Sequence, residues 1–327
     1  MEYRTLGRCD LQVSRLSLGG LFISSYGAAY EQARAAGMRA FELGVNYVDT
    51  APGYADSEEV LGKILADADG PVILSTKLGG RPMPFEPQNT DCLRKSVEES
   101  LRLLGREQID ILMIHEPDRP GQYDWWTDLG RAEGPVMELL DELKAEGTIR
   151  HTGLGGTTAY TLARLIRTGK FDVVLTAFNY SLLWREAAIE VLPAAAEQQM
   201  GVIIGSPLQQ GALARRQDDE VNGGAPWMSL PRRRQFKALY AFLDELGMGI
   251  VEVALRFVLS NPLVTCALTG ARSKAEVEQN VAAAEKGPLP ADVLARLDEI
   301  AAMVPFRPFE EPFGLPWGSA YKGPGHA

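Results

Sequence analysis

The stretch that decides the fold is 46–62, which reads NYVDTAPGYADSEEVLG. An apolar run ends here at Asp49, Tyr54 follows five residues later, and Ser57 with two glutamates after it is typical of the first turn of a helix. A buried strand, a loop and a helix in this order form one unit of a parallel α/β fold. The stretch also raises a question, because an acid and a tyrosine are not ordinary loop residues where a buried strand ends.

The same unit recurs along almost the whole chain. Apolar runs of strand length occur at 15–20, 45–49, 71–77, 109–115, 149–155, 171–178, 201–207 and 263–270. Helical patterns occur at 28–44, 57–67, 89–105, 133–147, 157–169, 185–199, 232–247 and 273–285. Continuous apolar strands separated by helices indicate parallel strands that are covered on both sides. Eight such units predict a single-domain (β/α)8 TIM barrel over residues 1–327.

An open, doubly wound sheet is the alternative for this pattern. A sheet of that kind that binds a dinucleotide carries G-x-G-x-x-G after its first strand. The turn after the first predicted strand reads GGLFISSYG, which does not match. The barrel is therefore the prediction.

Two connections are long, and the chain ends in an irregular tail. The connections 116–132 and 207–231 follow the fourth and seventh predicted strands, so in a barrel they lie over the catalytic face. The tail, 305–327, is rich in Pro, Gly and aromatic residues, a composition that excludes regular helix. Two arrangements are open for the tail: it packs over the barrel mouth, or it is loose.

Composition narrows the classes of partner. A net charge of −10 argues against nucleic acid or an anionic membrane. Cys9, Cys92 and Cys266 are widely spaced, so neither a zinc site nor a disulfide framework is expected. The chain has no apolar stretch of about eighteen residues and no signal-peptide pattern. We expect a reduced, soluble, cytoplasmic protein without a metal site; its oligomeric state stays open.

Four side chains that can carry chemistry stand at one level of the predicted barrel. Asp49, Lys77 and His115 end the second, third and fourth predicted strands, and Tyr54 lies in the loop after Asp49. Because neighbouring strand ends are roughly 5 Å apart, these groups can converge on one patch. Each alone has an ordinary alternative: a turn acid, a surface lysine, a structural histidine or a packing tyrosine. Their joint placement favours a site.

The chemistry of the four groups is compatible. A tyrosine hydroxyl has a pKa of about 10, and a buried ammonium beside it would stabilise the phenolate and lower that pKa. A carboxylate would keep the ammonium charged, and a histidine across the pocket can orient a substrate oxygen by a hydrogen bond. Such a site transfers a proton to or from an alcohol oxygen. The sequence offers no metal cluster for redox work, so the electrons have to come from a cofactor.

These residues lie in motifs that resemble the aldo-keto reductase family. The similarity runs from YRTLGRCDLQVSRLSLGG to LTGARSKAEVEQNVAAA, nearly the whole length. The match GVNYVDTAPGYADSEEVLGKIL is specific, and ILSTKLG, IDILMIHEPD and GSPLQQGAL support it. The resemblance implies a (β/α)8 barrel with a nicotinamide cofactor at its C-terminal face. It also implies that Tyr54 is the general acid/base, that Lys77 and Asp49 tune it, and that His115 places the substrate oxygen.

The resemblance further implies a set of cofactor contacts, from which the chain departs in places. Gly155 and Gly156 stand where many members have a Ser-Asn pair that holds the nicotinamide carboxamide, and Gly205 stands where an aromatic ring often stacks. Backbone groups, Asn179 or Ser206 would then hold the carboxamide. The implied contacts are Gly20, Asn179, Ser206, Leu208, Gly270, Arg272, Ser273, Glu276, Gln279 and Asn280.

One residue bears on the choice between NAD and NADP. Glu276 stands where many NADP-dependent members place an arginine on the 2′-phosphate. A carboxylate there would repel a phosphate and accept hydrogen bonds from ribose hydroxyls, which favours NAD. Arg272 and Lys274 are close enough in sequence to serve NADP, and Glu276 as an ordinary solvated helix residue is the other alternative. The expected cofactor is NAD or NADP, with NAD favoured.

The substrate is predicted from a looser resemblance. The motif GSPLQQGAL resembles the corresponding motif of a subgroup of sugar dehydrogenases that act on L-galactose or L-fucose. Trp125, Trp126 and Tyr26 are candidates for stacking on a sugar ring, with loop packing as the alternative. We expect oxidation of an aldose at C1 to a lactone, with Tyr54 as the base. The runner-up is a broad-scope NADPH-dependent aldehyde or ketone reductase, followed by a cofactor-sensing regulatory subunit. The motifs DTAPGYADSEE and ARSKAEVEQN disfavour an isomerase or aldolase barrel.

Overall fold

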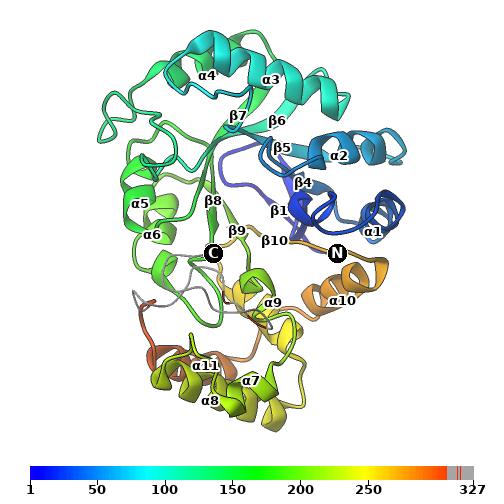
Figure 1. The fold of residues 1–327 in the computed structure, drawn as a ribbon, viewed down its shortest axis with the longest axis vertical. Coiled ribbons are helices and arrows are strands. Elements are labelled where there is room, and N and C mark those ends of the chain that lie inside the picture. The colour runs from blue at the N-terminus through cyan, green and yellow to red at the C-terminus, as the bar shows by residue number, and fades with distance from the viewer. Residues whose placement is uncertain (308–314, 316, 318–327) are drawn as a thin grey trace.

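The structure, a computed structural model, describes residues 1–307, 315 and 317. A closed barrel of eight parallel strands forms its centre (Figure 1). The strands are, in spatial order, β3 (Leu16–Gly19), β4 (Tyr47–Asp49), β5 (Ile73–Leu78), β6 (Ile109–His115), β7 (Ile149–Gly156), β8 (Val173–Ala177), β9 (Gly201–Gly205) and β10 (Cys266–Thr269). Each strand overlaps one of the predicted apolar runs, and the predicted (β/α)8 barrel is confirmed.

Helices surround the barrel. They are α1 (Tyr30–Glu42), α2 (Ser57–Ala66), α3 (Thr90–Leu104), α4 (Pro135–Ala145), α5 (Tyr160–Ile166), α6 (Val191–Glu197), α9 (Ile250–Ser260) and α10 (Lys274–Glu285). A further group, α7 (Asp218–Gly223), α8 (Leu230–Leu246) and α11 (Ala291–Ala302), lies farther from the strands, at the bottom of Figure 1. Three short 3-10 helices are η1 (Gly20–Phe22), η2 (Glu186–Ala188) and η3 (Gln209–Gly211). Within the described residues, no helix combines the length and the apolar character that crossing a membrane requires.

The seventh unit of the barrel differs from the prediction. The helix expected at 232–247 is present as α8, but α9, which was not predicted, is the helix that packs against α10 and β10. Nearly all residues of α9 are buried. Its charged residues, Glu252 and Arg256, lie four positions apart on one side of the helix, so the sequence carries an amphipathic pattern here that was overlooked. α11 was not predicted either.

An N-terminal hairpin packs against the interior of the barrel. Its strands, β1 (Tyr3–Thr5) and β2 (Gln12–Ser14), are antiparallel and only three residues long, so their sequence pattern was too short to predict them. Leu6, Leu11 and Val13 share one buried cluster with residues of the barrel strands. Gly7 has φ +56°, and a Cβ there would lie 2.1 Å from the backbone N of Gly201, so this close approach requires glycine.

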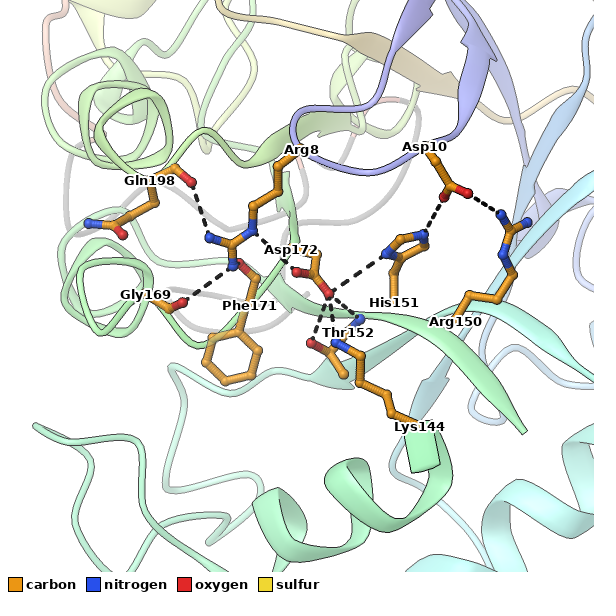
Figure 2. Close-up of polar contacts among 10 residues, drawn as sticks. All are labelled: Arg8, Asp10, Lys144, Arg150, His151, Thr152, Gly169, Phe171, Asp172 and Gln198. Atoms are coloured by element: carbon orange, nitrogen blue, oxygen red, sulfur yellow. Dashed lines mark hydrogen bonds and ion pairs between the residues drawn. The ribbon is translucent and has the colours of Figure 1, made fainter. Parts of the chain in front are cut away.

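Charged side chains hold the loop of the hairpin to the barrel, as Figure 2 shows. Arg8 Nε lies 3.2 Å from Asp172 Oδ1, and Arg8 Nη2 donates to the carbonyl oxygen of Phe171 at 2.6 Å. Asp10 contacts Arg150 Nη2 at 2.9 Å and His151 Nε2 at 3.0 Å. We call these contacts the hairpin clasp; they join the first residues of the chain to β7 and to the entry of β8.

Asp172 is the most buried acid of the clasp, and its charge is expected to stabilise the fold. Burial raises its pKa, but the backbone N–H of Thr152 and the ammonium of Lys144 outweigh burial and hold the pKa below its usual range. A carboxyl with a lowered pKa stabilises the folded state above its unfolded pKa of about 3.9, and this stabilisation is lost as the pH falls through the folded pKa.

We therefore expect Asp172→Asn to lower the free energy of unfolding by about 1.5–3 kcal/mol at neutral pH and by much less in acid. Urea denaturation at both pH values measures this difference. Asp10→Asn is the matched control, because the Asp10 side chain is 70% exposed and exposed ion pairs contribute little. A loss for Asp172→Asn that is the same at both pH values would contradict the role of its charge.

Candidate active site

Three strand ends and one turn bring the four predicted side chains to one cavity. Asp49 ends β4, His115 ends β6, and Lys77 is the last residue but one of β5. Tyr54 lies in the turn between β4 and α2. All four line a cavity of about 730 Å³, which is within the usual size range of ligand sites.

Lys77 and Asp49 form a buried ion pair. Lys77 Nζ lies 2.6 Å from Asp49 Oδ2 and donates to the carbonyl oxygen of Thr50 at 2.8 Å. The two side chains are 2% and 1% exposed. Burial lowers the pKa of Lys77, but the charges of Asp49 and Tyr54 outweigh it and leave that pKa above its usual value. Lys77 is therefore an ammonium in the cavity wall at neutral pH.

Tyr54 lies against this ammonium but stays protonated. Lys77 Nζ is 4.9 Å from the centroid of the Tyr54 ring. Burial raises the pKa of Tyr54, the charge of Lys77 lowers it, and Asp49 raises it again, so the net direction is upward. Lys77 lowers this pKa, as predicted, but burial and the charge of Asp49 outweigh it and decide the net direction.

His115 faces Tyr54 as a neutral imidazole. The two rings are edge-on with centroids 5.9 Å apart. Burial, and then the charge of Lys77, lower the pKa of His115 to about 3. Its Nδ1 is buried and has no hydrogen-bond partner among the described residues. A neutral imidazole carries one N–H, which can donate to a ligand oxygen without adding charge to the cavity.

Glu116, directly after His115, is a cavity residue that the sequence analysis missed. Its side chain is 12% exposed, and its Oε2 accepts a hydrogen bond from Thr157 Oγ1 at 2.6 Å. Burial raises the pKa of Glu116, although the Thr157 hydroxyl opposes this. The only signal in the sequence was an acid next to a strand-end histidine. The side chain places a second hydrogen-bonding group next to His115.

Strained backbone gathers around the cavity. Of the eight non-glycine residues with positive φ in the described chain, four line the cavity. They are Glu116, Phe178, Ser206 and Gln210, with φ of 50°, 68°, 51° and 52°. Such conformations cost about 1–3 kcal/mol each, persist only where the surrounding structure enforces them, and cluster at functional sites. Their position favours this cavity as the functional site.

The far end of the cavity is formed by β10 and the start of α10. The predicted residues that line it are Gly270, Arg272, Glu276, Gln279 and Asn280. Glu276 Oε2 accepts from the backbone N of Arg272 at 2.7 Å, and the N–H of Glu276 donates to Ser273 Oγ at 3.3 Å. Glu276, although exposed, is thus held in a capping arrangement. A helix N-terminus, an arginine and a carboxylate at one end of a long cavity fit a nucleotide diphosphate with its ribose.

The other predicted cofactor contacts divide into two groups. Gly20, Ser206 and Leu208 line the cavity. Asn179 and Ser273 are not among its lining residues. Asn179 Nδ2 donates to the carbonyl oxygen of Thr157 at 2.9 Å, and Ser273 Oγ caps α10. Both side chains are partly exposed, and their hydrogen bonds go to the backbone next to the cavity.

The structure contradicts the prediction for the two tryptophans. Trp125 and Trp126 are 0% and 8% exposed and do not line the cavity. Their Nε1 groups donate to the carbonyl oxygens of His115 and Pro117, at 2.9 and 2.7 Å. A buried indole N–H needs a partner, and here the last residue of β6 and the segment just after it supply the acceptors. The tryptophans hold the segment that carries His115 instead of presenting a face to a sugar. Tyr26, 68% exposed, does not line the cavity either.

The connection 207–231, predicted to lie over the catalytic face, and the tail, whose arrangement was left open, both contribute residues to the cavity. From the predicted connection 207–231 come Pro207, Leu208, Gln210, Gly211, Ala214, Arg215 and Gln217. From the tail come Leu315 and Trp317, and the ring of Trp317 packs edge-on against Trp227 with centroids 4.9 Å apart. Residues 308–314, 316 and 318–327 of the predicted tail lie outside the described residues. No group of three or more His, Cys, Asp or Glu in the described part of the chain could hold a metal ion.

Comparisons with known proteins agree with this geometry. Residues 15–302 match the Aldo/keto reductase family. L-galactose dehydrogenase of Arabidopsis thaliana is 31% identical, over 86% of this chain and 88% of that protein. D-threo-aldose 1-dehydrogenase of a Pseudomonas species is 30% identical, over 81% and 86%. An aldo-keto reductase of Bacillus halodurans, solved in its holo form, superposes with a TM-score of 0.76 at 27% identity, over 94% of this chain and 98% of that one.

Proposed function

Because this chain belongs to the aldo/keto reductase family and is thus an NAD(P)-dependent oxidoreductase, we propose that it oxidises an aldose at C1 to a lactone with NAD. The observation that carries the proposal is one cavity that holds a tyrosine, an ammonium, a neutral imidazole and a further acid, Glu116. The similarity to two proteins named as aldose dehydrogenases supports the same substrate class.

In this proposal the residues of the chain divide the work. A nicotinamide dinucleotide, held at the start of α10 by residues such as Arg272, would supply the hydride acceptor for C1 of the sugar. The Tyr54 oxygen accepts the proton of the C1 hydroxyl, and the ammonium of Lys77 stabilises the phenolate that this step needs. His115, neutral because its pKa is about 3, donates a hydrogen bond to the reacting oxygen. Glu116 accepts hydrogen bonds from neighbouring sugar hydroxyls.

The test is turnover of NAD or NADP with a panel of aldoses, together with the variant Glu116→Ala. We expect oxidation of an aldose with NAD, and a rise in KM of about tenfold in the variant, because hydrogen bonds to the sugar hydroxyls are lost. KM for a simple aldehyde in the reverse direction is expected to change little, because that substrate has no further hydroxyls. Glu107→Ala, a change at an exposed acid, is the control. Reduction of simple aldehydes by NADPH without oxidation of any sugar would contradict the proposal.

The preference for NAD is proposed on the basis of Glu276. Its carboxylate lines the cavity at the start of α10, where it repels a 2′-phosphate. We expect Glu276→Gln to raise kcat/KM with NADP on the order of tenfold and to leave kcat/KM with NAD within about twofold, since the lost repulsion acts on the phosphate alone. The glutamine oxygen can still accept from the backbone N of Arg272, so α10 keeps its cap. An unchanged ratio of the two cofactors would show that Glu276 does not select between them.

A further inference from the structure

A hydrogen-bond chain continues from Asp49 into the interior of the barrel. Ser75 Oγ lies 2.6 Å from Asp49 Oδ1, and the hydroxyl of Tyr47 lies 2.8 Å from Ser75 Oγ. Tyr47 and Asp49 are two residues apart on β4, and Ser75 and Lys77 are two apart on β5, so each pair points to the same side of its strand. Tyr47 and Ser75 are fully buried, and neither is part of the proposed mechanism.

The donor and acceptor in each of these hydrogen bonds follow from elementary rules. The Asp49 carboxylate, which is paired with Lys77, can only accept, so the hydroxyl proton of Ser75 points to Oδ1. The other acceptor within reach of Ser75 Oγ, the carbonyl oxygen of Val48, is 3.5 Å away and is a poor competitor. Ser75 Oγ must therefore accept from Tyr47. Burial and the charge of Asp49 raise the pKa of Tyr47 well above its usual value, so it remains a donor.

Packing alone does not account for these hydroxyls. The residues that share a buried cluster with Tyr47 are apolar, among them Ile111, Val173 and Ile203. A phenylalanine and an alanine would fill the positions of Tyr47 and Ser75 without the cost of burying two hydroxyl groups. The two hydroxyls instead form hydrogen bonds that lead to Asp49 Oδ1, the carboxylate oxygen to which Lys77 does not donate.

We propose that Ser75 and Tyr47 are positioning residues for Tyr54, acting through Asp49 and Lys77. With both carboxylate oxygens engaged, the charge of Asp49 is dispersed and its plane is fixed, so the ammonium of Lys77 stays shared between Asp49 and Tyr54. Loss of the Ser75 hydroxyl leaves Oδ1 without a donor, and the carboxylate then draws the ammonium toward itself. Tyr54 loses part of the charge that stabilises its phenolate. The inference deepens the proposed function, since it concerns the acid/base of the same site.

The test compares Ser75→Ala and Tyr47→Phe with the wild-type full chain. The expected result for Ser75→Ala is an alkaline shift of about 0.5–1 pH unit in the rising limb of kcat for aldose oxidation, which lowers the rate at neutral pH by roughly three- to tenfold. Tyr47→Phe is expected to shift the limb in the same direction by less, because it acts through one more bond. Ser17→Ala removes another buried hydroxyl, on β3, and serves as the matched control without a shift.

A second readout does not depend on any substrate. Ring-carbon labelled tyrosine reports the protonation of Tyr54 by NMR, and its signal is assigned by its loss in Tyr54→Phe. Ser75→Ala is expected to hold Tyr54 protonated to higher pH than in the wild-type chain. Profiles and titrations that superpose on the wild type, even with a lower melting temperature, would overturn the inference and leave Ser75 a purely structural residue. If no aldose is oxidised, the proposed function fails, while the NMR comparison still decides on the positioning role.

Discussion

Tyr54→Phe is expected to lower kcat for the oxidation of the sugar by about 10²–10⁴-fold, the usual contribution of general acid–base catalysis. The substitution removes the phenol oxygen that the proposal makes the proton acceptor, and it keeps the ring that faces His115 and Lys77. The dissociation constant of NAD, measured by fluorescence titration, and the unfolding midpoint are expected to stay close to those of the wild type. Stopped-flow measurement of the hydride step then assigns the loss to chemistry instead of product release.

The raised pKa of Tyr54 also predicts how the rates of oxidation and reduction change with pH. Because burial raises that pKa, the wild-type enzyme holds Tyr54 protonated at neutral pH, and the rate of oxidation should increase with pH while the rate of reduction decreases above the pKa. Because the pKa of His115 is about 3, titration of His115 should not change the rate between pH 5 and 8. Retention of more than a tenth of wild-type kcat in Tyr54→Phe would mean that another group carries the proton.

Asp49→Ala is expected to destabilise the fold by about 3–5 kcal/mol, because it leaves the ammonium of Lys77 buried without a counter-charge. Lys77 is 2% exposed, and its remaining acceptors would be the carbonyl oxygen of Thr50 and the hydroxyl of Tyr54, neither of which carries a charge at neutral pH. Activity should fall with stability, since a lysine without its carboxylate loses its proton and no longer stabilises the phenolate of Tyr54.

The double variant Asp49→Ala with Lys77→Met separates these two effects. Replacing both members of a buried ion pair by apolar groups is often neutral in stability, so the double variant should regain most of the free energy of unfolding that the single variant loses. Activity should remain lost, because the ammonium is absent. Urea denaturation and initial rates measure both quantities. A double variant less stable than Asp49→Ala would show that the ion pair is itself a large net contribution to the fold.

The barrel could be predicted because its determinants are local. Each strand is a short apolar run, such as 109–115 or 201–207, and each run is followed by a loop and, in most units, by a helical pattern. Strands of three residues in β1 and β2 leave too short a pattern to predict. The amphipathic pattern of α9, with Glu252 and Arg256 on one side, was present in the sequence and was overlooked. The burial of Leu6 and Val13 against the barrel follows from contacts that are distant in sequence.

The part of the site that could be predicted is the set of residues at the ends of the barrel strands, because the strand that carries them fixes their position. Asp49 pairs with Ser75 and Lys77 pairs with Met113, so Lys77 and His115 each lie two positions further along their strands than the partner of the preceding site residue. Because the strands of a closed barrel are tilted and staggered, these successive positions converge at its C-terminal end. The tryptophans were mispredicted because only the folded chain brings their indole N–H groups to the carbonyl oxygens of His115 and Pro117.

By itself the sequence determined the class of fold, the four groups at the strand ends and the family, because alternation of strand and helix and the motif around Tyr54 are properties of neighbouring residues. The tertiary structure alone decided the balance of charges at those groups. Whether burial or Lys77 sets the pKa of Tyr54, and which hydroxyl reaches Asp49 Oδ1, depends on distances between residues of different strands. Such distances follow from the closed barrel, and no local pattern encodes them.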